Sequence, residues 1–265
     1  MGESFKLTIL GQAKWILGMR VSYKPNGAIQ IDQEKYLLEI LKRFGMENVK
    51  SYATPAIADK CKTGNKLPTN QGDYLSLIGS LIYLAMVTRP DISFAVSKAG
   101  RAMANPTQTD MLAAKQILHY LRGTTSRGIT YGPNGSSEIE GYADTDFVGD
   151  LDSRRSTSGY VFMLGNGAIS WMSKRQATIT LLTTEVEYIS ACAAAQEAIY
   201  LQRLAIDLHH EVTNATVLYQ DNQGAIAIEK DFISNRRSKH IDIMIKIFIL
   251  TFNLKNKFVL LLTRI

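Results

Sequence analysis

The sequence GYADTDFVGDLDSRRSTSGYVF, residues 141–162, decides how the second half of this chain is interpreted. Four aspartates fall within nine positions of it: Asp144, Asp146, Asp150 and Asp152. They follow an expected strand at 139–143 and precede a second one. Removing carboxylates from water is costly unless a cation or hydrogen bonds compensate them, and hard divalent cations take oxygen ligands. One interpretation is a metal-binding strand end; the other is a solvated acidic turn, in which Asp is common.

The composition indicates a globular protein with an excess of basic residues. Of the 265 residues, 46% are hydrophobic and 20% charged, which argues against disorder. The net charge of +6 fits a nucleic-acid partner without requiring one. Cys61 and Cys192 are the only cysteines, so we expect a reducing compartment and no disulfide framework. We expect no secretory signal and no membrane partner, because no continuous apolar run approaches the ~20 residues of a span.

The first half is expected to be mostly helical after an N-terminal β-hairpin. Strands are expected at 15–23 and 27–31, joined by a Lys-Pro-Asn-Gly turn. Helices are expected at 33–46, over most of 74–104 and at 108–122. An extended connection is expected over 50–72, and an interruption of the second helical region at 88–92, where Pro90 disfavours a helical conformation at Arg89.

The second half alternates differently and predicts a mixed α/β sheet. Three short strands are expected at 139–143, 160–164 and 168–173, then a long helix at 183–208, a fourth strand at 216–220 and a short helix at 223–230. Three strands before a helix predict an antiparallel meander. The fourth strand then joins by a crossover, beside the first.

Acids from three of these elements are expected to meet. Asp144 is expected to end the first strand and Asp221 the fourth, while Glu185 and Glu187 lie in the first turn of the long helix. Three carboxylates would hold two divalent ions roughly 3.5–4 Å apart, as in phosphodiester cleavage. The alternatives are structural: Asp221 caps the following helix, and the glutamates complement the helix dipole.

The periodicity of the long helix leaves the choice between the two glutamates open. Its buried face is expected to be set by Val186, Ile189, Ala193, Tyr200 and Leu204. Both glutamates then lie roughly a quarter-turn from that face, on opposite sides.

The longer motifs resemble one known family. Residues 141–176, TTEVEYISA (183–191), YQDNQGAIAI (219–228) and SKHIDI (238–243) resemble the RNase H region of Copia-type LTR-retrotransposon Pol polyproteins. Upstream, LGQAKWILGMRV (10–21), QEKYLLEILKRFGM (33–46), TPAI (54–57) and residues 74–96 resemble the end of the reverse transcriptase and its connection to RNase H. The resemblance covers nearly all of residues 5–243.

The resemblance implies an RNase H-like fold that hydrolyses the RNA strand of RNA–DNA hybrids. It assigns Asp144, Glu187 and Asp221 as catalytic residues and as ligands of two Mg²⁺ or Mn²⁺ ions, and so selects Glu187 over Glu185. Such an enzyme recognises hybrid geometry and 2′-hydroxyls rather than sequence. The side chains available to contact nucleic acid are Arg154, Arg155, Lys174, Arg175, Asn222, Gln223, Arg236, Arg237 and Lys239; for each basic residue the alternative is a solvated surface position.

The same resemblance suggests three regions and two departures from the family. Residues 1–135 correspond to the reverse-transcriptase end and connection, 136–242 to an incomplete RNase H-like domain, and 243–265 to an aberrant apolar tail. No Asp-Asp pair is present, so polymerase activity is not expected. Residues 243–265 contain no acid, so the family's fourth metal-site aspartate has no counterpart there. We therefore expect cleavage to be impaired or lost, and the sheet to lack its last strand.

Three functional hypotheses follow. The first is a Pol fragment with RNase H ancestry, whose partners are RNA–DNA hybrids or other nucleic acid and the rest of the polyprotein. The second is a non-catalytic nucleic-acid-binding remnant. The third is a structural remnant or pseudogene product without function. The expected location is the cytoplasm, with virus-like particles and the nucleus as alternatives.

Overall fold

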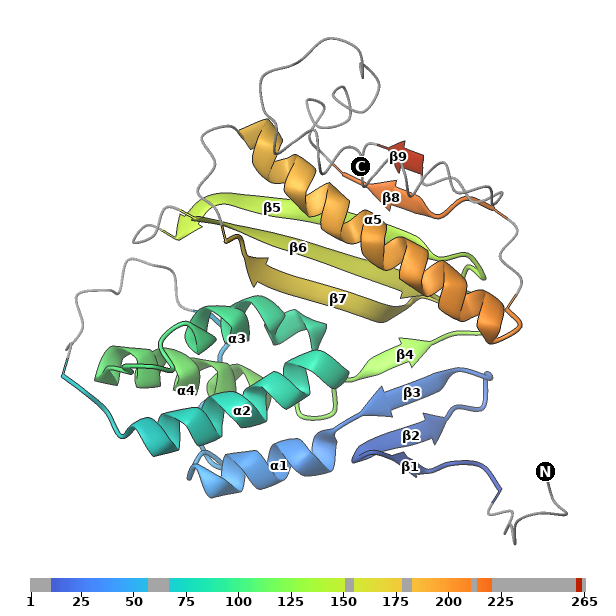
Figure 1. Cartoon of the computed structure of the whole chain (residues 1–265). Helices are drawn as coiled ribbons and strands as arrows, with labels where there is room; N and C mark the ends of the chain where they lie inside the picture. Colours follow the sequence, from blue (N-terminus) through green and yellow to red (C-terminus); the bar gives the residue numbers. More distant parts are fainter. Residues whose placement is uncertain are drawn as a thin grey trace, which may run out of the picture. The chain divides into compact units, whose positions relative to one another are not determined.

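The chain contains two compact units in a computed structural model that describes residues 11–56, 67–150, 155–177, 183–210, 214–220 and 261–263. Unit 1 is Met1–Pro133 and unit 2 is Asn134–Ile265 (Figure 1). Each unit has its own hydrophobic core. The expected domain limits at 135 and 242 stay predictions.

Unit 1 has a small antiparallel sheet in the order β1-β2-β3-β4. Its strands are β1 (Trp15–Ile16), β2 (Met19–Tyr23), β3 (Ile29–Asp32) and β4 (Ile129–Tyr131). The single strand expected at 15–23 is wrong, because Leu17 and Gly18 take positive φ values of 48° and 79° and reverse the chain. Strand β4 was not predicted. Gly128, directly before β4, lies so close to the end of β3 that a Cβ on it would lie 2.7 Å from Cβ of Asp32.

Four α-helices form the core of unit 1. They are α1 (Glu34–Arg43), α2 (Gln71–Val87), α3 (Ser93–Gly100) and α4 (Gln108–Arg122), with the short 3₁₀ helix η2 (Pro90–Ile92) before α3. The expected interruption near Pro90 is confirmed, because α2 ends at Val87. Helix α4 begins with a capping box, in which Thr107 and Asp110 satisfy each other's backbone N–H groups.

A buried arginine connects η2 to the end of α4. The guanidinium of Arg89, 2% exposed, donates to both carboxylate oxygens of Asp91 at 2.9 Å and to the carbonyl and hydroxyl of Thr124 at 3.0 and 2.7 Å. It also lies 5.6 Å from the ring centre of Tyr120. Burial acts to raise the pKa of Asp91, but the hydrogen bonds and charge of Arg89, with smaller contributions from Tyr120 and Arg127, outweigh it and lower the pKa below 3.8.

We predict that Arg89→Ala destabilises unit 1 by about 3 kcal/mol, because it removes the buried cation that pairs with Asp91 and donates to Thr124. Because the folded-state pKa of Asp91 is lowered, its stabilisation is present above the unfolded pKa and is lost as the pH falls below 3.8. Urea unfolding between pH 3 and 7 should show that loss in the wild type and a weaker one in the variant. Arg127→Ala is the control, because Arg127 is exposed and 3.7 Å from Asp91; an equal effect of both variants would contradict the prediction.

Unit 2 has a five-stranded mixed sheet in the order β7-β6-β5-β8-β9. Its strands are β5 (Glu140–Asp150), β6 (Arg155–Leu164), β7 (Gly167–Arg175), β8 (Val217–Tyr219) and β9 (Leu261–Thr263). Strands β5, β6 and β7 form an antiparallel meander, and β8 joins beside β5 in parallel. The mixed sheet and its crossover are therefore confirmed.

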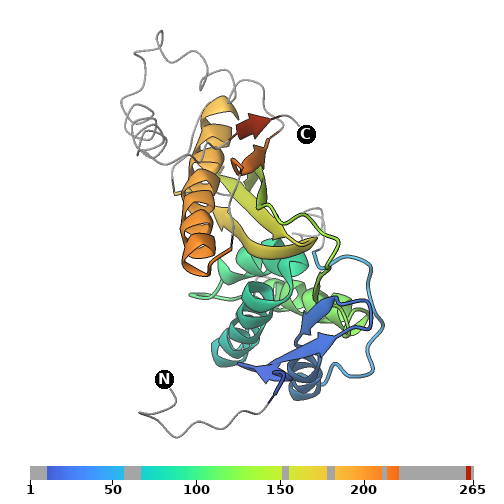
Figure 2. The same cartoon turned by 90° about the vertical axis from the view of Figure 1, so that its right-hand side faces the viewer.

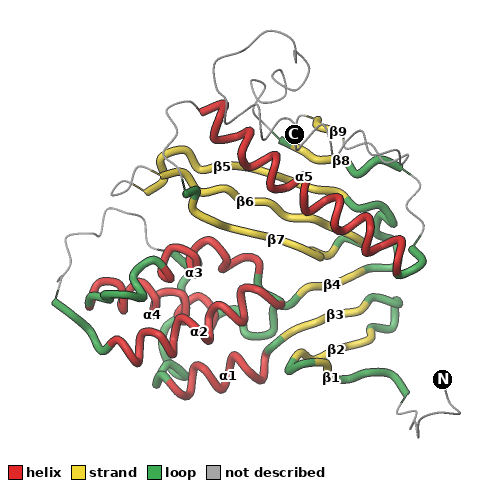
Figure 3. Tube along the Cα trace, in the orientation of Figure 1, coloured by secondary structure: helices red, strands yellow, loops and turns green. Residues whose placement is uncertain are grey.

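Helix α5 (Thr183–Asp207) supplies that crossover and packs on one face of the sheet, against β5 and β6 (Figures 2 and 3). Its buried face is mostly alanine: Ala191, Ala194, Ala195, Ala198 and Ala205. The predicted face was wrong in part, because Tyr200 and Leu204 are exposed. A face of small alanine side chains gives a weaker periodic signal than large apolar residues such as Tyr200 and Leu204, which is why the sequence favoured the larger ones.

Two further expectations about unit 2 need correction. The acidic cluster was expected to follow a strand, but Asp144, Asp146 and Asp150 all belong to β5, which continues seven residues past the expected end at 143. The tail was expected to leave the sheet without its last strand, but Leu261–Thr263 pairs in parallel with β8 as β9. The short helix expected at 223–230 lies outside the described residues.

Gly141 marks the tightest point between β5 and its neighbours. A Cβ there would lie 2.9 Å from Cδ1 of Leu218 and would also overlap the ring of Phe162, which is fully buried. Gly159 on β6 differs, because a Cβ would meet only the carbonyl of Met172 at 3.5 Å.

We predict that Gly141→Ala destabilises unit 2 by about 1–3 kcal/mol through overpacking of this contact. Gly159→Ala, the matched control on the next strand, should change the free energy of unfolding by much less. Thermal unfolding of the two variants measures the difference. Equal stability of both would show that Phe162 of β6 and Leu218 of β8 do not crowd Gly141 as described.

Candidate active site

The residues predicted to carry chemistry lie toward one end of the strands of the unit 2 sheet. This end of the strands is the edge of the sheet that holds the site. Strands β5, β7 and β8 run toward this edge, β6 starts from it, and α5 begins beside it (Figures 1 and 3). The arrangement follows from the topology. In an antiparallel meander the first and third strands end at the same edge, and a parallel crossover strand returns to end there too.

Asp144 is held at this edge through its backbone. Its carboxylate is exposed, and Oδ1 accepts the N–H of Thr145 at 2.8 Å. Its carbonyl accepts the hydroxyl of Ser190 on α5 at 3.0 Å, and the same hydroxyl lies 3.4 Å from the carbonyl of Gly159. Ser190 is fully buried. A single hydroxyl therefore ties α5 to both central strands at the position of Asp144.

Glu187 lies one helical turn before Ser190 and is 8% exposed. The side-chain amide of Gln220, the residue that follows β8, donates to the carboxylate Oε2 of Glu187 at 3.2 Å and to its backbone carbonyl at 3.1 Å. Glu187 thus faces the sheet near the end of β8. The side chain of Glu185 lies outside the part of the chain that the structure describes.

A second buried glutamine holds the first turn of α5 from the other side. Gln176, which follows β7, donates to the hydroxyl of Ser158 at 2.8 Å and to the backbone carbonyl of Val186 at 3.1 Å. The contact fixes α5 to the end of the β6–β7 hairpin. None of Gln176, Ser190 and Gln220 was singled out from the sequence. The one signal was position, since Gln220 directly precedes Asp221 and Gln176 ends the basic Lys-Arg-Gln run.

Three of the predicted nucleic-acid contacts come together at the same edge. Arg155 starts β6 opposite Asp150 of β5, and the end of β7 places Lys174 and Arg175 opposite Ser158 and Thr157. Lys174 is exposed and the two arginines are half-buried. The remaining predicted contacts and the third predicted carboxylate lie outside the described residues: Arg154, Asp221, Asn222, Gln223, Arg236, Arg237 and Lys239.

The donor set at this edge suits a hard divalent cation in its chemistry. Asp144 and Glu187 supply carboxylate oxygens, the ligands that Mg²⁺ and Mn²⁺ prefer. Among the described residues no group of three acids or other metal-ligating side chains forms. Asp144 and Glu187 are the described part of this donor set, and the complete set of three requires Asp221.

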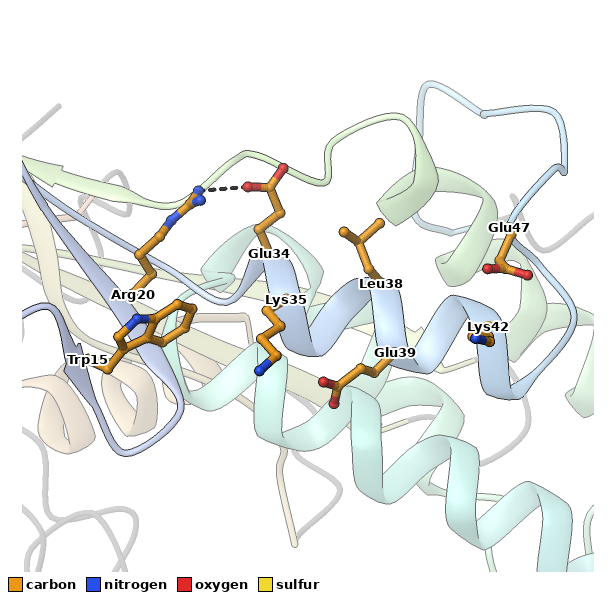
Figure 4. Close-up of a pocket in the computed structure, with 8 residues that line it drawn as sticks. All are labelled: Trp15, Arg20, Glu34, Lys35, Leu38, Glu39, Lys42 and Glu47. Carbon is orange, nitrogen blue, oxygen red and sulfur yellow. Dashed lines mark hydrogen bonds and ion pairs between the residues drawn. The ribbon is translucent and has the colours of Figure 1, made fainter.

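Unit 1 has a pocket of about 450 Å³ between β1–β2 and α1 (Figure 4). Trp15 and Leu38 line it together with the Arg20–Glu34 ion pair, whose atoms lie 2.7 Å apart. Its charges are mixed, and no residue predicted to carry chemistry contributes to it. Within the described helices, no segment combines the length and hydropathy of a transmembrane helix.

Relatives of the chain include transposon polyproteins and a mitochondrial protein. It is 40% identical over 256 residues to a retrovirus-related Pol polyprotein from transposon TNT 1-94 of Nicotiana tabacum, covering 92% of this chain and 19% of that polyprotein. It is 35% identical over 246 residues to the polyprotein from transposon RE1 of Arabidopsis thaliana, covering 92% and 17%. An uncharacterised mitochondrial protein of Arabidopsis thaliana is 33% identical over 201 residues, 74% of this chain and 82% of that protein. The resemblance to Pol polyproteins is confirmed, and the chain spans about one fifth of their length.

Two solved structures that match are of an RNase H1 isolated from compost. The enzyme itself matches with a TM-score of 0.36 and 14% identity, over 49% of this chain and 85% of that one. Its complex with an RNA/DNA hybrid matches with a TM-score of 0.35 and 12% identity, over 48% and 85%. No protein-family model matches the chain. The fold of unit 2 is described by its own strand order and directions: a five-stranded mixed sheet with α5 on one face.

We predict that Ser190→Ala lowers the free energy of unfolding by about 1–2 kcal/mol, because the buried hydroxyl that donates to the carbonyl of Asp144 is lost. Gln196→Ala is the control, since Gln196 is exposed on the same helix. Hydrogen exchange of the α5 amides should rise most in its first turns in the Ser190 variant. Uniform protection in both variants would contradict a clamp at this point.

Proposed function

Because this chain belongs to the family of retrovirus-related Pol polyproteins of transposons, we propose that unit 2 is a divalent-metal-dependent ribonuclease. Its substrate would be the RNA strand of RNA–DNA hybrids. The chain would act as part of a Pol polyprotein. The single observation that supports this most is the attachment of Glu187 and of the Asp144 backbone to one sheet edge, through Gln220 and Ser190. The edge brings acids from two elements distant in sequence to the start of α5.

The proposed metal ligands are Asp144, Glu187 and Asp221. Asp221 follows Gln220 in the chain, and Gln220 contacts Glu187, so the third acid is one residue from a described contact of the second. When bound, Mg²⁺ or Mn²⁺ activates water and stabilises the leaving 3′ oxygen of the phosphodiester. The Glu187 carboxylate is buried and accepts the side-chain amide of Gln220, which fixes it at this edge.

The substrate would be held by the basic residues at the same edge. Arg155, Lys174 and Arg175 lie beside the acids and supply cations for phosphate contacts, which position a nucleic acid without reading its sequence. Such binding weakens as salt rises, because bound phosphates release counterions. Selection of a hybrid would rest on its shape and on the 2′-hydroxyls of the RNA strand.

A second candidate function is binding of hybrids without cleavage. It is favoured by the absence of any acid in residues 243–265. The two candidates share the basic edge and differ only in the metal chemistry.

We predict that the chain binds a labelled RNA–DNA hybrid and cleaves its RNA strand in Mg²⁺ at an impaired rate. Asp144→Asn should abolish that cleavage while leaving salt-dependent binding. The loss is expected to exceed about 100-fold, the scale on which removing one preorganised electrostatic group lowers kcat. Gel analysis of the cleaved RNA measures it.

Asp146→Asn is the matched control, since Asp146 is exposed on the same face of β5, two residues further along. It should retain cleavage. Cleavage that survives Asp144→Asn would contradict the proposed site. Hybrid binding without any cleavage by the folded wild type would favour the second candidate.

A further inference from the structure

We infer that Gln220 is a positioning residue for this edge, whose side-chain amide holds the carboxylate of Glu187 in the orientation that binds the metal. The inference rests on the proposed function, because it takes Glu187 as a metal ligand. It goes further in assigning a role to a neutral residue that touches neither the metal nor the substrate.

The geometry allows one orientation of the amide. Nε2 of Gln220 lies 3.2 Å from Oε2 and 3.1 Å from the backbone carbonyl oxygen of Glu187. An ionised carboxylate and a carbonyl only accept hydrogen bonds, so the NH₂ group must face them. A flipped amide would place its oxygen against two oxygens. One side chain therefore fixes both the first turn of α5 and the acid that the turn carries.

Stability alone does not account for an amide at this position. Gln220 is fully buried, and its Oε1 has no hydrogen-bond partner among the described residues. A buried acceptor without a partner loses its hydration without compensation, whereas an apolar side chain of similar size would avoid that penalty. The amide is thus costly for folding, and what it provides is an oriented donor to Glu187. Donors to ligating carboxylates affect metal affinity strongly in metal sites.

Gln176 offers a matched comparison within the same molecule. It is also a buried glutamine after a strand, it also donates to a backbone carbonyl in the first turn of α5, and its Oε1 also lacks a described partner. Among the residues that the structure describes, its amide donates to Ser158 and to the carbonyl of Val186 and to no carboxylate. Removing either amide loosens the first turn of α5, but only the amide of Gln220 donates to the carboxylate of Glu187.

The test compares Mn²⁺ binding by the wild-type chain, Gln220→Met and Gln176→Met, measured by isothermal titration calorimetry without nucleic acid. Gln220→Met should bind Mn²⁺ about tenfold more weakly, and Gln176→Met should stay within about twofold of the wild type. Circular dichroism checks that each variant is folded. If Gln220→Met does not fold, Gln220→Asn, which keeps the amide but shortens its reach, should weaken binding in the same direction.

A second measurement separates positioning from general loosening. In a Glu187→Gln background, Gln220→Met should cause no further loss of Mn²⁺ affinity, because the carboxylate it orients is gone. Equal affinities of the Gln220 and Gln176 variants, or a further loss in that background, would overturn the inference and leave the proposed function standing. A folded wild type that binds no Mn²⁺ would overturn both.

Discussion

The attachment of α5 to the ends of the sheet strands is the constraint on which unit 2 depends. Three buried polar side chains, Gln176, Ser190 and Gln220, donate to carbonyls or to a carboxylate within the first two turns of the helix or on the strands beneath it. Apolar contacts alone do not fix the position of a helix along a sheet when the contacting side chains are alanines, because these are too small to interlock with the strands. Directional hydrogen bonds, costly to break when buried, set its register.

That register decides where charge accumulates. The helix brings Glu187 beside the residue that follows β8, while the hairpin of β6 and β7 brings Arg155, Lys174 and Arg175 to the same edge. Acidic and basic side chains therefore meet at one place on the sheet. An edge with buried and exposed carboxylates next to cations suits a phosphodiester held together with divalent ions.

The sequence predicted the order of elements in unit 2 well, because strand and helix periods and the Gly-Asn-Gly turn are local signals. It misplaced the acids relative to β5, since Asp144 and Asp146 resemble turn residues and only the long pairing with β6 keeps them extended. It also misjudged the buried face of α5, where alanines rather than Tyr200 and Leu204 pack inward. The candidate acids were found from composition and family motifs, but Gln220 was not, because a buried amide gives no periodic signal.

The central claim is that the edge of unit 2 binds a divalent ion through Asp144 and Glu187. Anomalous diffraction from crystals of the chain grown with Mn²⁺ tests it most directly, because Mn²⁺ is located independently of its ligands. The account predicts an anomalous peak about 2.1 Å from carboxylate oxygens of both residues. Ordered carboxylates of Asp144 and Glu187 that face apart, with no Mn²⁺ between them, would contradict it.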